Sequence, residues 1–198
     1  MTGTNFSRLS KIPPQPWQVD HGGGINVGYT CHMAAMHWAQ MALGSSQTDA
    51  NRIVGAFARL HCPGCKGRGP HGSVLPSAYG NTFCRNAVPI SDRASLYKNV
   101  QVGDVLITGH HRMPMHTMIV RQKRGEGHIT VRGFNNFGTL GTGIRDHYDP
   151  KSHNIAKDKY WGARDGGFGR VGVPIPLWVV PHNHFMQASR MLRHHVGK

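Results

Sequence analysis

Residues 21–44 read HGGGINVGYTCHMAAMHWAQMALG and join a glycine-rich loop directly to a strong helix pattern. Alanine, methionine and leucine dominate the second half of this stretch, and these residue types favour helix. Gly44 then supplies the residue that most often follows a helix end. We therefore predict a helix that begins at Cys31, at the exit of the loop, and ends before Gly44.

Residues 103–134, GDVLITGHHRMPMHTMIVRQKRGEGHITVRGF, change to the two-residue period of β-strands. The pattern predicts strands at 105–108, 116–122 and 128–134, with a hairpin turn at 124–127. In an antiparallel hairpin with this turn, the numbers of paired residues sum to about 250. Helices precede these strands, which indicates an α+β fold with a small antiparallel sheet.

The rest of the chain predicts shorter elements in a single domain over residues 1–198. Prolines indicate an irregular lead-in at 1–28. Helices are expected at 49–60, 92–98 and 185–192, and Ser46 or Thr48 would cap the first of them. A polar loop is expected at 135–168, followed by one more strand at 171–180. The segment 61–86, rich in Cys, Gly and Pro, looks like an insertion.

Charge and hydropathy limit the classes of function. The chain has 23 Lys and Arg against 9 Asp and Glu, a net charge of +14, so we expect polyanions such as a bacterial wall polymer to attract it. The cations are scattered rather than arranged in a stripe, which argues against specific nucleic-acid binding. Apolar stretches are too short for a transmembrane segment. Residues 1–17 lack the apolar core of a signal peptide.

Cys31 is the leading candidate for a nucleophile. At a helix start its sulfur would lie against unpaired backbone N–H groups, so we expect a lowered pKa. The same N–H groups would form an oxyanion hole, with Asn26 as a further side-chain donor. The alternative is a buried cysteine that packs as a small apolar residue.

His116 begins the second predicted strand, 85 residues after Cys31. An imidazole there would take the thiol proton. The hairpin register places Asn135 and Asn136 opposite this strand start, where an amide carbonyl would orient the ring. Asp158 is a second candidate for this third role. Alternatively, the two asparagines only form a turn.

A second set of residues has the spacing of metal ligands. Cys62 and Cys65 form one C-x-x-C pair, and Cys84 with His61 or His71 would complete a structural zinc site. A disulfide to Cys84 or a redox pair are the alternatives. The thiol chemistry itself requires no cofactor.

Clustered histidines also permit a metallohydrolase hypothesis. His110, His111 and His116 lie close in sequence, and Asp104 is a carboxylate near them. No pair of histidines with metal-binding spacing on one helix accompanies them, so the thiol reading is favoured.

Four short motifs, GYTCHMAAMHWA, VGDVLI, HTMIV and VRGFNN, occur in this order. They resemble the papain-like superfamily, especially its NlpC/P60 and CHAP branch. The resemblance implies a papain-like fold, attack by Cys31 on an amide carbonyl, an acyl-thioester intermediate, and His116 as acid and base. The chain departs from the family at two points: typical members have Asp-Cys before the helix and often a histidine as the third catalytic residue, whereas this chain has Tyr29-Thr30-Cys31 and an asparagine.

Residues 133–150, GFNNFGTLGTGIRDHYDP, look similar to small bacterial type VI secretion effectors. This resemblance implies a toxin made in the bacterial cytoplasm, exported without a classical signal peptide, with a delivery partner and an immunity protein. Hydrolysis of peptidoglycan peptides is the leading expectation. The alternatives are a deamidase or protease acting on a host protein such as a small GTPase, and a non-enzymatic basic module that binds polyanions.

Overall fold

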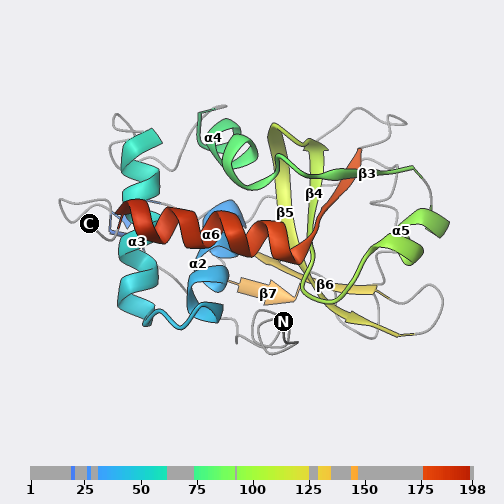
Figure 1. The fold of residues 1–198 in the computed structure, drawn as a ribbon, viewed down its shortest axis with the longest axis horizontal. Helices are drawn as coiled ribbons and strands as arrows, with labels where there is room; N and C mark the ends of the chain where they lie inside the picture. Colours follow the sequence, from blue (N-terminus) through green and yellow to red (C-terminus); the bar gives the residue numbers. More distant parts are fainter. Residues whose placement is uncertain are drawn as a thin grey trace.

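The computed structural model describes residues 19–20, 26–27, 31–61, 74–91, 93–124, 129–134, 144–146 and 176–196. In this part of the chain, helices pack against an antiparallel six-stranded sheet, as Figure 1 shows. The α+β class predicted from the sequence is therefore confirmed. No helix among the described residues is both long and apolar enough to cross a membrane.

Five helices are described, and three of them lie close to their predicted positions. The bounds are α2 Cys31–Ala42, α3 Gln47–His61, α4 Val74–Phe83, α5 Arg93–Asn99 and α6 His182–Val196. Gly44 has a φ of 89° after α2, the left-handed conformation that favours glycine at a helix end. At α3 the Ser46 hydroxyl accepts the Asp49 N–H at 3.1 Å, so Ser46 rather than Thr48 is the N-cap.

The strands of the main sheet run in the order β3-β8-β4-β5-β6-β7, and each neighbouring pair is antiparallel. Their bounds are β3 Val88–Ile90, β4 Val105–His110, β5 Met113–Lys123, β6 Ile129–Phe134, β7 Ile144–Asp146 and β8 Leu177–Val180. Val120 pairs with Val131 across β5 and β6, close to the predicted register.

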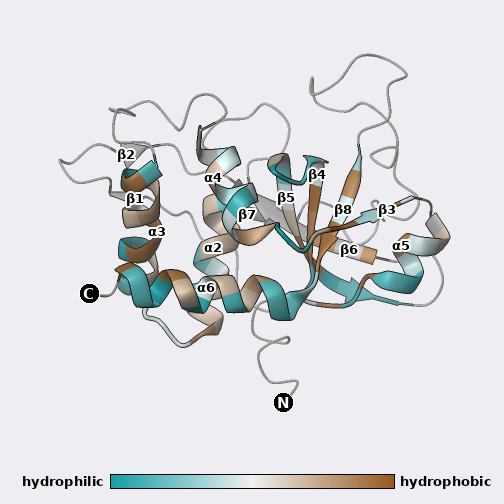
Figure 2. Cartoon of the chain, turned by 45° about the horizontal axis from the view of Figure 1, so that its top comes forward, coloured by the Kyte–Doolittle hydropathy of each residue, from teal (hydrophilic) through white to brown (hydrophobic). Residues whose placement is uncertain are grey.

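Alternation along the central strands divides the core between the two faces of the sheet. Ile107 and Ile119 belong to one apolar cluster with α2, α3, α4 and α6. Leu106 and Met118 belong to a second cluster, which includes Leu96 of α5. Figure 2 shows the brown strands between the helices on one side and α5 on the other.

Regular structure lies within three segments that the sequence analysis describes as an insertion, a polar loop and an irregular lead-in. Helix α4 lies within 61–86, β7 lies within 135–168, and the lead-in 1–28 contains a short hairpin of β1 Val19–Asp20 with β2 Asn26–Val27. For α4 the physical reason is burial, because Tyr79 and Phe83 stack at 5.2 Å inside the core. A Cβ on Gly80 would lie 2.4 Å from the Arg112 backbone, so glycine permits this close approach.

The C-terminal helix begins earlier and ends later than predicted, over His182–Val196 rather than 185–192. Its first turn is capped from a distant part of the chain, since the Asp104 carboxylate accepts the His182 N–H at 2.9 Å. A cap supplied by tertiary contact is not visible in the local sequence. Strand β5 likewise begins at Met113, so His116 lies within the strand rather than at its start.

Candidate active site

Cys31 is the first residue of α2, as predicted, and it is a free thiol with 9% of its surface exposed. Three backbone N–H groups interact with its sulfur: those of Thr117, His32 and Cys31 itself. Two of them belong to the open first turn of the helix, which has no intrahelical acceptor. Cys31 thus lies at the helix start that the sequence predicts.

The predicted ionisation of this thiol is wrong. Burial raises the pKa of Cys31 to about 12, and the opposing effect of the three N–H groups is smaller. Desolvation disfavours the charged form wherever the donors do not replace the lost water completely. Cys31 is therefore a neutral thiol at pH 7, and any catalytic use requires its proton to leave during attack.

The N–H of Thr117 is available to the sulfur because of its place on the sheet. Val120 directs its N–H and carbonyl toward Gly103 and Asp104, next to β4. Alternation therefore directs the Thr117 N–H to the other side, toward β6. The last pair between β5 and β6 at this end is Met118 with Gly133, so Thr117 lies one residue beyond the ladder.

His32 is a site residue that the sequence analysis missed. Its Nδ1 lies 2.7 Å from the Thr117 hydroxyl and 3.7 Å from the Cys31 sulfur, and its ring stacks on Tyr79 at 4.6 Å. Burial lowers the pKa of His32 to about 4, so the imidazole is neutral at pH 7. The available signal was its position directly after the candidate nucleophile.

His116 is buried in β5 and pairs with Thr108 of β4. It directly precedes Thr117, whose backbone N–H contacts the Cys31 sulfur. Alternation places the His116 side chain on the sheet face that carries Met118, whereas Thr117 and Ile119 face α2. Cys31 therefore meets β5 at Thr117, on the sheet face opposite the His116 side chain, and the structure does not bring the predicted Cys31–His116 pair together.

The structure describes little or nothing of the remaining predicted site residues. Asn26 lies in β2, where only the backbone is described. Asn135, Asn136, Asp158, Cys62, Cys65 and His71 lie outside the described residues, so their roles stay predictions.

The two described members of the predicted zinc site lie in different surroundings. Cys84 is a fully buried free thiol in the apolar core, and burial raises its pKa. His61 ends α3 and packs its ring on Phe57 at 4.5 Å. Across the described ranges, no group of three or more His, Cys, Asp or Glu side chains is arranged to hold a metal ion.

Asp104, the carboxylate of the metallohydrolase hypothesis, has a structural role. Its two oxygens accept the N–H groups of Gln101 at 2.8 Å and His182 at 2.9 Å. The carboxylate therefore holds the start of α6 in place.

The two histidines of the same hypothesis lie elsewhere. His110 and His111 lie at the turn between β4 and β5, with ring centroids 4.6 Å apart, and His111 packs on Trp178.

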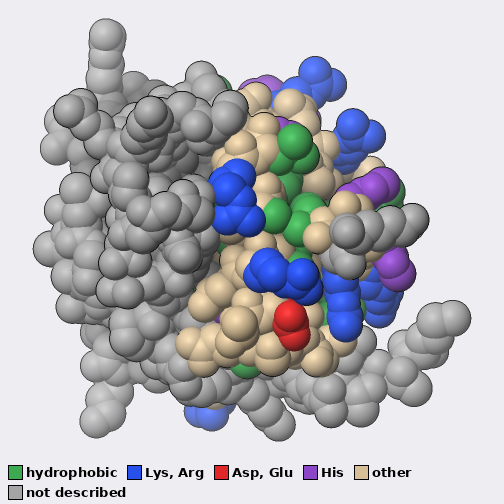
Figure 3. All heavy atoms as spheres, turned by 90° about the vertical axis from the view of Figure 1, so that its left-hand side faces the viewer, with side chains coloured by type: hydrophobic (Ala, Val, Ile, Leu, Met, Phe, Trp, Pro, Cys, Tyr) green, Lys and Arg blue, Asp and Glu red, His purple; other side chains and the backbone are tan. Residues whose placement is uncertain are grey.

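The structure gathers cations that look scattered in the sequence. The last turns of α3 and α6 together carry Arg59, His61, Arg193, His194 and His195. The Arg193 guanidinium also donates to the Leu43 carbonyl at 3.2 Å, near the end of α2. Figure 3 shows Lys, Arg and His side chains on this side of the molecule. Cations at helix C-termini also complement the helix dipoles.

No family model, curated protein or solved structure matches this chain.

Proposed function

We propose that the protein is a cysteine-dependent amide hydrolase with a papain-like fold, in which Cys31 is the nucleophile and His32 the general base. One observation carries the proposal: the Cys31 sulfur, at the N-terminus of α2, interacts with backbone N–H groups and lies 3.7 Å from the His32 Nδ1. A thiol among backbone donors, beside an imidazole, is the arrangement that thiol acyl transfer requires.

The resting protonation state determines the order of events. Because Cys31 is a neutral thiol, its proton passes to the neutral His32 imidazole as the sulfur attacks the amide carbonyl and the S–C bond forms. The imidazolium then gives that proton to the leaving amine as the C–N bond breaks. Water, deprotonated by the same imidazole, hydrolyses the acyl-thioester and releases the carboxylic acid and the thiol.

The backbone donors have a specific task in this reaction. Negative charge develops on the carbonyl oxygen in the tetrahedral intermediate, and N–H groups at a helix start stabilise it. The N–H groups of Cys31 and His32 already interact with the sulfur, so they lie where this oxyanion forms. The hydrogen bond between His32 and the Thr117 hydroxyl also holds β5 against the start of α2.

Peptidoglycan peptides are the proposed substrate, and the protein is proposed to act as a bacterial effector toxin with an immunity protein. The net charge of +14 supports an anionic wall as the place of action, because diffuse positive charge concentrates an enzyme there. Deamidation or proteolysis of a host protein would use the same residues.

A second candidate function is polyanion binding without catalysis. The cations on the last turns of α3 and α6 favour it, because they form one basic surface rather than isolated charges. In that case Cys31 would be a structural residue, and binding would weaken steeply with added salt.

Replacing Cys31 tests the proposal. Cys31→Ser should lower the cleavage of muropeptides, followed by mass spectrometry of the products, by about a thousandfold or more. Cys84→Ala is the matched control, because it removes the other described buried thiol, and it should change the rate by less than about threefold. A small GTPase in a parallel assay would reveal deamidation by the mass shift of the substrate.

The outcomes separate the candidate functions. Equal activity of Cys31→Ser and the wild-type protein would contradict thiol catalysis. If the wild-type protein forms no product in either assay but binds DNA or wall polymer with a steep salt dependence, polyanion binding replaces the hydrolase.

A further inference from the structure

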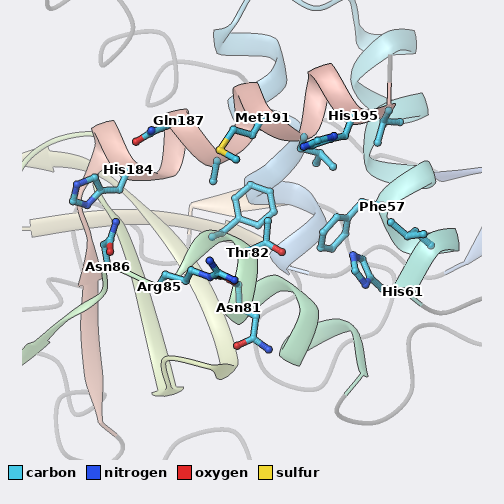
Figure 4. Close-up of a pocket in the computed structure, with 15 residues that line it drawn as sticks. Phe57, His61, Asn81, Thr82, Arg85, Asn86, His184, Gln187, Met191 and His195 are labelled. Atoms are coloured by element: carbon cyan, nitrogen blue, oxygen red, sulfur yellow. Dashed lines mark hydrogen bonds between the residues drawn. The ribbon is translucent and has the colours of Figure 1, made fainter. Parts of the chain in front are cut away.

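A groove of about 520 Å³ lies between α3, α4 and α6, and none of the proposed catalytic residues lines it. Figure 4 shows Gln187, Met191 and His195 along one side, with Asn81 and Arg85 on the other. Its floor includes Phe57 and Phe83, which contact each other edge to face at 5.8 Å in the core. The floor is therefore rigid.

Helix α6 has a buried stripe and a second stripe of mixed polarity that lines the groove. Phe185, Ser189 and Leu192 are buried. His184, Ala188, Met191 and His195 recur every three or four residues and line the groove. The small Ala188 in the middle of this second stripe leaves room for another element to approach α6 closely.

The two most exposed of the large apolar side chains in the described part of the chain lie at this groove. Leu60 is 71% exposed and Met191 is 55% exposed, and both line it. Large exposed apolar side chains around an apolar floor are typical of an interaction site.

The charge around the groove has one sign. Among the described residues, Arg85 is the charged side chain that lines it, beside the imidazoles of His61, His184 and His195, and no carboxylate does so. The Arg85 guanidinium donates to the Asn81 carbonyl at 2.7 Å, which holds the side chain over the end of α4. Arg59 lies in the last turn of α3 and Arg193 in the last turn of α6, the two helices that form the sides of the groove with α4. An occupant complementary to this groove is apolar on one face and acidic on its flanks.

We propose that this groove binds an acidic amphipathic helix of a partner protein. The groove stripe of α6 extends from His184 to His195, about 16 Å at the helical rise, which matches about three turns of a bound helix. Apolar side chains at i, i+4 and i+7 of the partner occupy the space over Phe57 and Phe83. Its Asp and Glu side chains meet Arg85 and the histidines. This surface is separate from the proposed catalytic residues and does not depend on the proposed activity.

A synthetic peptide tests the proposal with the full chain. The probe is a fluorescein-labelled helix of about four turns, with leucines at i, i+4, i+7 and i+11 and glutamates on the remaining face. Fluorescence anisotropy should give a Kd of about 1–100 μM. The same peptide with lysine in place of glutamate, and a scrambled peptide of the same composition, should bind at least about tenfold more weakly.

Variants locate the binding site. Leu60→Glu combined with Met191→Glu, and separately Arg85→Glu, should each weaken binding about tenfold or more. Val88→Glu combined with Met113→Glu is the matched control, because these side chains are 45% and 48% exposed and lie outside the groove. Arg112→Glu is the control for Arg85→Glu. All of these positions are exposed, so the variants keep the fold.

Several results would overturn the proposal. Equal binding of the scrambled peptide would mean attraction by charge alone. Equal losses of binding in the groove variants and the control variants would show that the groove is not the binding site. No binding of the acidic peptide at about 1 mM would also contradict the proposal. A loss confined to the groove variants would support it.

Discussion

Cys31 and Cys84 are both buried free thiols with raised pKa values, yet they lie at opposite ends of helices. Cys31 begins α2, where backbone N–H groups point outward. Cys84 directly follows α4 and donates its own N–H to the Gly80 carbonyl. The helix dipole favours negative charge at the first position and disfavours it at the second.

Burial and reactivity are therefore separate properties of a thiol. Burial alone raises the pKa at Cys84, where no opposing effect accompanies it. At Cys31 three N–H groups oppose the burial, so the same donors are ready to stabilise charge that develops later on sulfur or on a bound carbonyl oxygen. The three following predictions test this comparison.

Alkylation should separate the two thiols most strongly. Iodoacetamide should label Cys31 about a thousandfold faster than Cys84 in the folded protein, because Cys84 is 0% exposed and must wait for unfolding. With a pKa of about 12, Cys31 should react about tenfold faster for each pH unit between roughly pH 7 and 10. Peptide mass spectrometry gives both rates, and both thiols should react alike in urea. A plateau below about pH 8 would show that Cys31 is an activated thiolate.

Acid should lower the stability of the folded protein through His32, which lies beside Cys31. Its folded pKa is about 4, and that of His37 is also about 4, whereas an unfolded histidine titrates near 6.5. Between these values the unfolded chain binds more protons, so stability is full above about pH 6.5 and falls toward pH 4. Each histidine should contribute on the order of 3 kcal/mol to this loss.

Urea unfolding at several pH values measures this effect. His32→Asn and His37→Asn should each remove about half of the pH dependence, because each removes one buried group that must bind a proton on unfolding. His194→Asn is the control, since His194 is exposed. An unchanged pH dependence in both buried variants would contradict the assignment.

The smallest effect is expected at Thr117. Thr117→Val removes the hydroxyl that lies 2.7 Å from His32 and should lower the free energy of unfolding by about 1–3 kcal/mol. Thr117→Ser keeps the hydroxyl and should lose less than about 1 kcal/mol. The alkylation rate of Cys31 should rise in the valine variant while that of Cys84 stays the same. Equal changes at both thiols would mean that Thr117 acts on the whole core.

Elements with strong local patterns were predictable. The helix formers of α2 end at Gly44, and the two-residue period of β4 to β6 marks the strands and their register. Helix α4 was missed because Pro76 and Gly80 are typical of loops. Proline is tolerated in the first turn of a helix, and Gly80 is required by the close approach of the Arg112 backbone.

The candidate site was only partly predictable for a similar reason. The placement of Cys31 at a helix start follows from nearby residues. The partner of its sulfur, Thr117, depends on how α2 packs against the end of the ladder between β5 and β6. His32 becomes a site residue only through that packing, because its own sequence neighbours do not show which strand it meets.

Local sequence was enough to predict a cysteine at the first turn of a helix, an antiparallel hairpin with His116 and an excess of positive charge. The neutral state of the thiol and the groove that Arg85 shares with histidines of α3 and α6 follow from the packing of distant segments. Helix and strand preferences act over a few residues and can be read locally. Desolvation and charge clustering depend on which distant segments pack together, so they exist only in the folded chain.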